Sequence, residues 1–80
     1  MRLETKEKYY KISKEGIALL KYIIESYDGA AVVRTVDKTE MILEIMIAPG
    51  FEEVIDSVID ELSVELGIVT IEKPNNVDPL

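Results

Sequence analysis

The stretch AAVVRTVDKTEMILEIMIAPGFEEVI, residues 30–55, decides the fold of this chain. It holds two runs of β-branched and other apolar residues, 30–36 and 41–48, separated by the polar tetrapeptide Asp-Lys-Thr-Glu. Two such runs joined by a short polar loop are typical of a β-hairpin. The second run ends at Pro-Gly, and a helical pattern follows at once. The stretch therefore predicts two antiparallel strands that lead through a tight corner into a helix.

The helix after the corner covers residues 51–66, FEEVIDSVIDELSVEL, because apolar side chains recur there at helical spacing. Acidic residues fill the other face, and several lie in the first half of the helix, where they interact favourably with its dipole. Gly67 is the expected stop. The positions that we expect to face the core are Phe51, Val54, Ile55, Val58, Leu62 and Leu66.

The corner itself raises the question of an anion site, because a glycine turn that opens a helix can bind phosphate. Glu52 and Glu53 occupy the first turn after Gly50 and would repel an anion. Phosphate loops also carry several glycines and usually a lysine, which this corner lacks. We therefore expect a structural corner.

The sequence before and after this unit predicts three more elements. Residues 8–13 (KYYKIS) have the composition of a strand, and Ser13 stands where the N-cap of a helix over 14–27 belongs. Gly29 follows as a helix stop. Residues 68–73 (IVTIEK) are expected to form the last strand.

The predicted order is therefore β-α-β-β-α-β, which closes into an α+β ferredoxin-like sandwich. Right-handed crossovers give a four-stranded antiparallel sheet in the order 4-1-3-2, with both helices on one face. We expect residues 1–7 to be a loose N-terminus, residues 8–73 to form a single domain and residues 74–80, with two prolines, to be a flexible tail.

The composition limits the chemistry. The chain has no cysteine and no histidine, so it lacks thiol nucleophiles, disulfides and the commonest metal ligand and general base. We predict no catalytic residue, no metal site and no cofactor, although a pair of carboxylates acting as acid and base stays open. The acidic face of helix 51–66 lacks the alternating spacing of a calcium loop.

The charge and the hydropathy limit the partners. The formal net charge is −7, and binding to nucleic acid depends on basic side chains that neutralise phosphates, so we expect no nucleic-acid partner. No apolar run approaches the ~20 residues of a membrane span. The N-terminal residues also lack the apolar core of a signal peptide. We therefore expect a cytoplasmic protein with no membrane partner.

One face of the predicted sheet has no helix over it, and the hairpin register decides which residues lie there. If residues 37–39 form the loop, Val33 lies opposite Leu43 under the helices, and Arg34 lies diagonal to Glu44 on the open face. The alternative register would bury Arg34 in the core, at a high cost in free energy. The expected open face comprises Val32, Arg34, Val36, Ile42, Glu44, Met46 and one of Tyr9 or Tyr10.

This open face is more apolar than solvent alone requires. A continuous exposed apolar patch commonly marks an interface, so we expect the chain to associate with itself through it. The plainer interpretation is that these are strand-forming residues scattered over a small surface.

A second candidate site is the loop before the first helix, with Ser13, Lys14 and Gly16 as possible ligand contacts. Its plainer interpretation is an N-cap serine with exposed charges. In the functional interpretation, Gly16 lets a small ligand approach the backbone between two subunits.

Four short motifs carry a resemblance: YY at 9–10, ESYDG at 25–29, VVRT at 32–35 and APG at 48–50. Together they resemble a small uncharacterised bacterial family, a domain of unknown function, over roughly residues 8–72. That resemblance implies no activity.

A more distant resemblance is to ACT-type regulatory domains, which share the order of elements. The stretch SKEGIALLKYIIESYDGAAV is similar to the ACT segment in which a loop with a glycine opens the first helix and a second glycine follows it. Gly16 and Gly29 would be these glycines, and Ser13 stands where an aspartate is usual. In ACT domains this loop meets a neighbouring domain and helps to bind an amino acid.

These inferences lead to two hypotheses about function. The first is a non-catalytic, ACT-like interaction or small-molecule-sensing module that acts as a homo-oligomer, a dimer or a tetramer, with an amino-acid-like ligand. The alternative is a heteromeric adaptor that docks its open sheet face on a larger protein.

Overall fold

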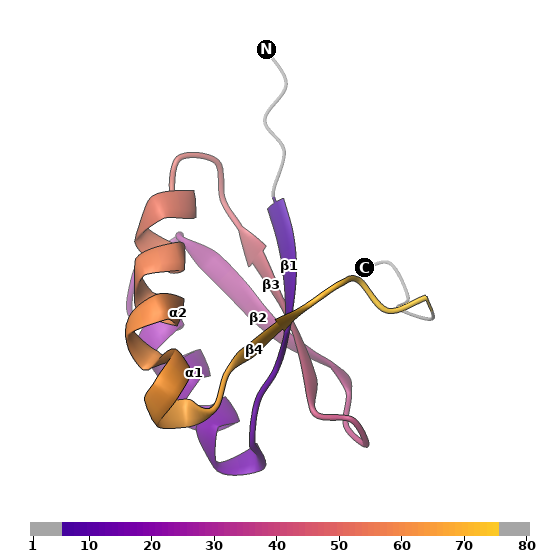
Figure 1. Cartoon of the computed structure of the whole chain (residues 1–80). Coiled ribbons are helices and arrows are strands. Elements are labelled where there is room, and N and C mark those ends of the chain that lie inside the picture. Colours follow the sequence, from indigo (N-terminus) through magenta and orange to yellow (C-terminus); the bar gives the residue numbers. More distant parts are fainter. Residues whose placement is uncertain (1–5, 76–80) are drawn as a thin grey trace.

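The structure is a computed structural model that describes residues 6–75, and its elements follow the predicted order (Figure 1). The first strand begins two residues earlier than expected, and most of the predicted N-terminal and C-terminal tails lies outside the described residues. The elements are β1 (Lys6–Lys11), α1 (Lys14–Glu25), β2 (Ala31–Asp37), β3 (Ile42–Ile47), α2 (Glu52–Leu66) and β4 (Val69–Ile71).

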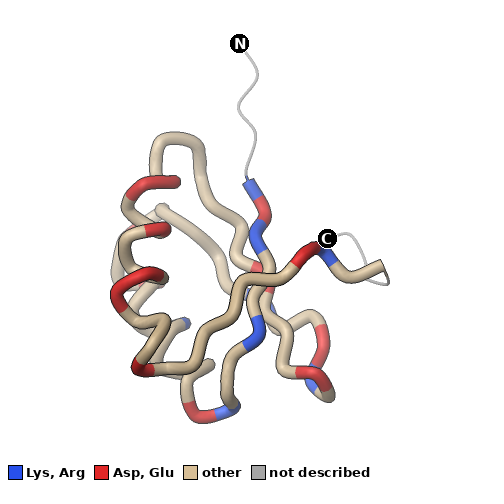
Figure 2. The backbone as a smooth tube through the Cα atoms, viewed as in Figure 1, with Lys and Arg blue, Asp and Glu red and all other residues tan. Residues whose placement is uncertain are grey.

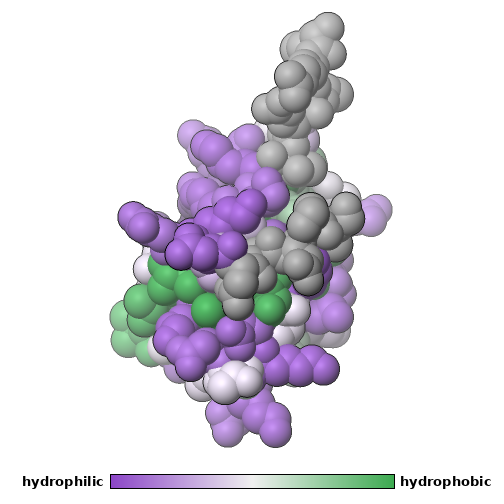
Figure 3. Space-filling view, turned by 90° about the vertical axis from the view of Figure 1, so that its right-hand side faces the viewer, coloured by the Kyte–Doolittle hydropathy of each residue, from purple (hydrophilic) through white to green (hydrophobic). Residues whose placement is uncertain are grey.

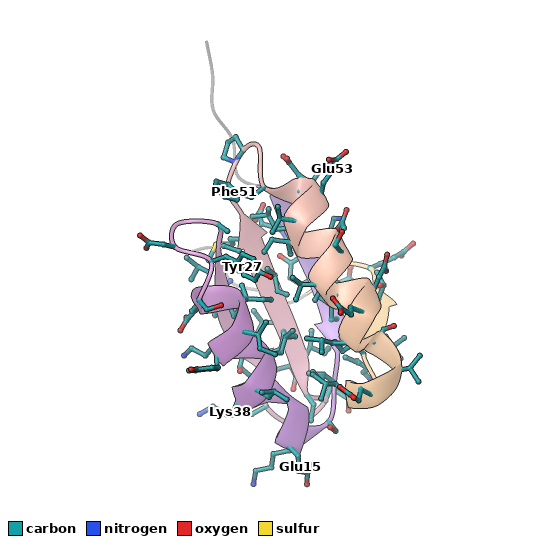
Figure 4. All side chains as sticks on the ribbon, turned by 90° about the vertical axis from the view of Figure 1, so that its left-hand side faces the viewer. Glu15, Tyr27, Lys38, Phe51 and Glu53 are labelled. Carbon is teal, nitrogen blue, oxygen red and sulfur yellow. The ribbon has the colours of Figure 1, made fainter. Side chains whose placement is uncertain are left out.

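The four strands form one antiparallel sheet in the order β2-β3-β1-β4. This is the predicted order 4-1-3-2 read from the other end, so the α+β, ferredoxin-like fold is confirmed. Both helices lie on the same side of the sheet in Figure 1. They run in opposite directions, since Glu15 near the start of α1 and Glu53 near the start of α2 lie at opposite ends of the helix layer in Figure 4. Neither helix, within residues 6–75, is long and apolar enough to cross a membrane.

The register of the β2–β3 hairpin differs from the predicted one by two residues. Val33 pairs with Ile45 rather than with Leu43. A bulge between Thr35 and Asp37 and a turn that ends at Met41, whose φ is +56°, make the connection longer than the three residues expected. Because side chains alternate with a period of two, a shift of two residues leaves each side chain on its predicted face.

The core lies between the sheet and the helix layer. Phe51 and Val54 were predicted to face it, and that prediction is wrong, because both side chains are exposed. Phe51 precedes the first helical residue, and Val54 lies about a quarter-turn from the centre of the buried stripe of α2. Ile59, which the prediction omitted, is buried instead. The buried cluster comprises Tyr10, Ile12, Leu20, Ile24, Ala30, Val33, Leu43, Ile45, Ile47, Ile55, Val58, Ile59 and Ile68.

The ends of the helices explain how the chain reverses direction. Gly67 adopts the left-handed conformation, with φ +64°, and ends α2 as predicted; β4 follows. Helix α1 ends at Glu25, and Gly29, with φ +76°, then turns the chain toward β2. Tyr27 from this turn and Phe51 before α2 lie at the same end of the helix layer in Figure 4, and both are exposed.

Candidate functional site

The pairing of β1 with β3 decides on which face of the sheet the two adjacent tyrosines lie. Tyr9 lies opposite Glu44, and Tyr10 lies opposite Leu43. Because side chains alternate along a strand, Tyr9 shares the open face with Glu44, whereas Tyr10 points toward the helices and belongs to the core. Tyr9 is therefore the tyrosine of the predicted interface.

The centre of the open face is a polar cluster of Tyr9, Arg34 and Glu44, in which Tyr9 and Glu44 are buried and Arg34 is half-buried. Glu44 is only 2% exposed. The Tyr9 hydroxyl donates to Glu44 Oε2 at 2.5 Å. From β2, Arg34 Nε donates to Glu44 Oε1 at 3.1 Å, and Arg34 Nη2 lies 2.9 Å from the same oxygen. Arg34 lies directly opposite Glu44 rather than diagonal to it, as the shifted register requires.

The environment keeps the Tyr9 hydroxyl protonated. Burial, followed by the hydrogen bond to Glu44 and the charge of that carboxylate, raises the pKa of Tyr9 to about 12. The phenol can therefore act as a hydrogen-bond donor to Glu44 over the whole neutral range. The cluster joins side chains from three neighbouring strands of the sheet, β2, β3 and β1.

The exposed part of the predicted interface is smaller than expected, because Tyr9, Ile42 and Glu44 are all buried. The side chains of this face that stay exposed lie on β2 and on Met46 of β3, which pairs with Val32 near the start of β2. Val32 is 55% exposed, and its partners in this group are partly exposed. We call this group the β2 margin: Val32, Arg34, Val36 and Met46.

The β2 margin borders an open edge of the sheet. On its outer side β2 pairs with no strand among residues 6–75, and it is seven residues long. Its charged side chains are engaged: Arg34 pairs with Glu44, and Asp37 Oδ1 accepts the backbone N–H groups of Thr39 and Glu40 at 2.9 Å each. Edge strands are usually short or protected by lysines, and β2 is neither, although the bulge near Asp37 interrupts one end of its edge.

The opposite edge carries exposed apolar residues that sequence reasoning missed. Val69 of β4 is 57% exposed, and Val64 near the end of α2 is 95% exposed. Figure 3, which looks onto the open face, shows hydrophobic surface at its lower left and hydrophilic surface above it. The apolar run of the last strand could have indicated exposed valines, but only the pairing of Val69 with Lys11 shows on which face Val69 lies.

The predicted ligand loop forms the start of α1. The Ser13 side chain caps the helix by accepting the Gly16 N–H at 3.3 Å, so the N-cap expectation is confirmed. Gly16 is buried, and a Cβ there would lie 3.0 Å from Ile12 Cδ1, so the glycine permits close packing on Ile12. Lys14 is exposed. A ligand at this loop stays a prediction.

The Pro-Gly corner before α2 has its own internal partner. Gly50 adopts φ +90°, and its N–H donates to Glu52 Oε1 at 3.1 Å. The acidic side chain thus occupies one of the N–H groups that an anion would need, which agrees with the structural role expected from the sequence.

Comparison with curated proteins and with solved structures gives no match. Residues 10–65, more than half of the chain, match the family described as "Domain of unknown function (DUF4911)". The matched segment runs from the end of β1 almost to the end of α2 and includes Arg34 and Glu44. This agrees with the resemblance carried by the four short motifs, and the chain belongs to this family of unknown function.

Proposed function

We propose that the protein is a non-catalytic interaction module that works as a homo-oligomer and makes its contact through the edge of β2 and the β2 margin. One observation carries this proposal: a seven-residue edge strand without a neighbour among residues 6–75 lies beside the exposed side chain of Val32. An uncovered apolar edge of this kind is a template for pairing with another strand.

A two-fold axis beside β2 gives the simplest arrangement. Two copies of β2 would then run antiparallel and join two four-stranded sheets into one, and the same residues would contribute from both subunits. Backbone hydrogen bonds would supply affinity, and the β2 margins would meet on the open face of the joined sheet. The edge of β4 is a poorer template because it offers only three residues.

The second part of the proposal is small-molecule sensing in the cytoplasm. The ACT-like arrangement of the first loop and helix supports a ligand near Ser13, Lys14 and Gly16, at a boundary between subunits. The absence of cysteine agrees with a reducing compartment.

The test of self-association is native mass spectrometry and size-exclusion chromatography of the purified chain at several concentrations. We expect a dimer or a larger even assembly for the wild type. Val32→Asp places a charge at the proposed contact and should shift the assembly to monomer, with at least a tenfold weaker association. Val69→Asp is the matched control, because this valine lies on the same face of the other edge strand and is equally exposed.

Each result decides the proposal. A monomeric wild type at every concentration would rule out self-association and leave the β2 margin to a different protein, the adaptor hypothesis. Dissociation by Val69→Asp but not by Val32→Asp would place the contact on the β4 edge and overturn the assignment to β2.

A further inference from the structure

A cavity of about 550 Å³ lies where β1 extends beyond β4. Strand β4 pairs only with Tyr9–Lys11, so the first half of β1 has no strand on that side within residues 6–75, as Figure 1 shows. Helix α2 forms the opposite wall, and the chain that leaves β4 closes one end. This volume lies within the range of small-molecule sites, about 300–1,000 Å³.

Tyr10 lines the cavity, and its hydroxyl oxygen is accessible from it, since no fully buried side-chain oxygen among residues 6–75 lacks a hydrogen-bond partner. The Tyr10 side chain as a whole is only 2% exposed, and its hydroxyl makes no hydrogen bond with any residue of the described part of the chain. Burial, followed by the charges of Asp56 and Asp60, raises the pKa of Tyr10 to about 12. The group is therefore protonated at neutral pH, and a phenol can both donate and accept a hydrogen bond.

Two carboxylates of α2 border the same cavity, one helical turn apart, and only one of them has a cation. Lys8 Nζ lies 2.6 Å from Asp56 Oδ1. Asp60 is on the same side of the helix, four residues on, and has no ion-pair partner among residues 6–75. In Figure 2 the acidic residues follow one another along α2, while lysine and glutamate alternate at the start of β1.

We propose that this cavity binds a small primary amine, whose ammonium group lies between the carboxylate of Asp60 and the hydroxyl of Tyr10. An ammonium group has three donors, so it can satisfy the carboxylate and the phenol oxygen together. The hydrogen bond from Lys8 Nζ to Asp56 shows that a carboxylate of α2 already binds an ammonium group beside this cavity. The buried side chain of Ile59 lies in the same wall and would contact the apolar body of the ligand.

The sign of the charge favours an amine over an acid. Glu7, Asp56 and Asp60 line the cavity against Lys8 and Lys73, which leaves a formal charge of 2 − 3 = −1. Lys73 would repel the bound ammonium group, so its removal should strengthen binding of a simple amine. This proposal goes beyond the proposed function, because the cavity lies at the other end of β1 from the Ser13 loop and shares no residue with it.

The experiment is an NMR titration of the ¹⁵N-labelled full chain with n-butylamine, and with n-butanol and butyrate as probes of similar size. We expect n-butylamine to bind with a dissociation constant on the order of millimolar and to shift the amides of Tyr10, Asp60 and Thr70. Asp60→Asn should weaken binding about tenfold and Tyr10→Phe several-fold, whereas Lys73→Met should strengthen it about threefold. Glu61→Gln, which removes a charge of the adjacent exposed residue, should leave binding unchanged.

Equal shifts from n-butanol or butyrate, or equal affinity in Asp60→Asn and the wild type, would overturn the proposal. The same titration of Val32→Asp separates it from self-association. Loss of assembly with retained amine binding supports both assignments. Absence of amine binding in a wild type that still assembles removes the ligand site and leaves the interaction module intact.

Discussion

Glu44 holds a charge at the centre of the open face, on an inner strand, where it is almost fully buried. A buried carboxylate is tolerated only where partners offset the loss of water. Its partners come from both neighbouring strands, Tyr9 from β1 and Arg34 from β2. A shift of either neighbour along β3 would leave Glu44 with one partner fewer, so these three residues specify the register of the sheet. Apolar side chains at the same three positions would not distinguish the correct register from a shifted one.

We expect Arg34→Met to lower the free energy of unfolding by about 2 kcal/mol, because it leaves a buried carboxylate with the Tyr9 hydroxyl but without its cation. The double variant Arg34→Met/Glu44→Leu should lose less than the sum of the two single effects, since no buried charge remains, although the Tyr9 hydroxyl then lacks its acceptor. Urea denaturation of the wild type, both single variants and the double variant measures the coupling. A double variant that loses the sum of the two single effects would contradict this account.

At the scale of elements, the order and the ends of the helices followed from short-range signals: alternating apolar runs, the Ser13 cap and the Gly67 stop. The register of the hairpin did not, because the bulge at Thr35 and the left-handed Met41 have no distinct signature in the sequence. The Arg34–Glu44 pair was predictable from charge and spacing. The contribution of Tyr9 was not, since the choice between two adjacent tyrosines depends on long-range pairing of β1.

The start of α1 allows a direct test of its structural role. Ser13→Ala removes the side chain that accepts the Gly16 N–H, and we expect a loss of about 1 kcal/mol in the free energy of unfolding. Ser63→Ala is the control, because Ser63 lies inside α2, where its hydroxyl donates to the Asp60 carbonyl and alanine is a better helix former. Urea denaturation compares the two. Equal stabilities of the two variants would mean that the cap contributes nothing.

The molecule as a whole has an unusual distribution of titratable groups. It lacks histidine and cysteine, the side chains that ordinarily titrate nearest to neutral pH. Its inner strand β1 instead buries two adjacent tyrosines, one on each face of the sheet. The cavity beside Tyr10 could not be read from the sequence, because residues 68–73 predict a longer last strand, and only three of them pair.

Stability should therefore fall at alkaline pH. Both buried phenols have a pKa of about 12 in the folded chain, above the ordinary value of about 10, so the unfolded chain loses these protons first. The contribution of the two tyrosines to the free energy of unfolding is complete below about pH 10 and is lost as the pH rises toward 12. Urea denaturation at several pH values should show a fall of more than about 1 kcal/mol across this range. The free energy of unfolding of Tyr9→Phe should fall less over this range. A wild-type free energy of unfolding that stays constant up to pH 12 would contradict the raised pKa of the two tyrosines.

The shortness of β4 has a consequence for how the chain opens. Its three pairs with β1 join residues that are far apart in sequence, such as Tyr9 and Ile71, so the loop that they close is nearly as long as the domain. Closing so long a loop costs entropy that few hydrogen bonds offset, and this makes β4 the natural site of local, sub-global unfolding. Thr70 and Ile71 are also a wall of the amine cavity. A ligand bound against Thr70 and Ile71 would therefore hold this strand closed and slow its local unfolding.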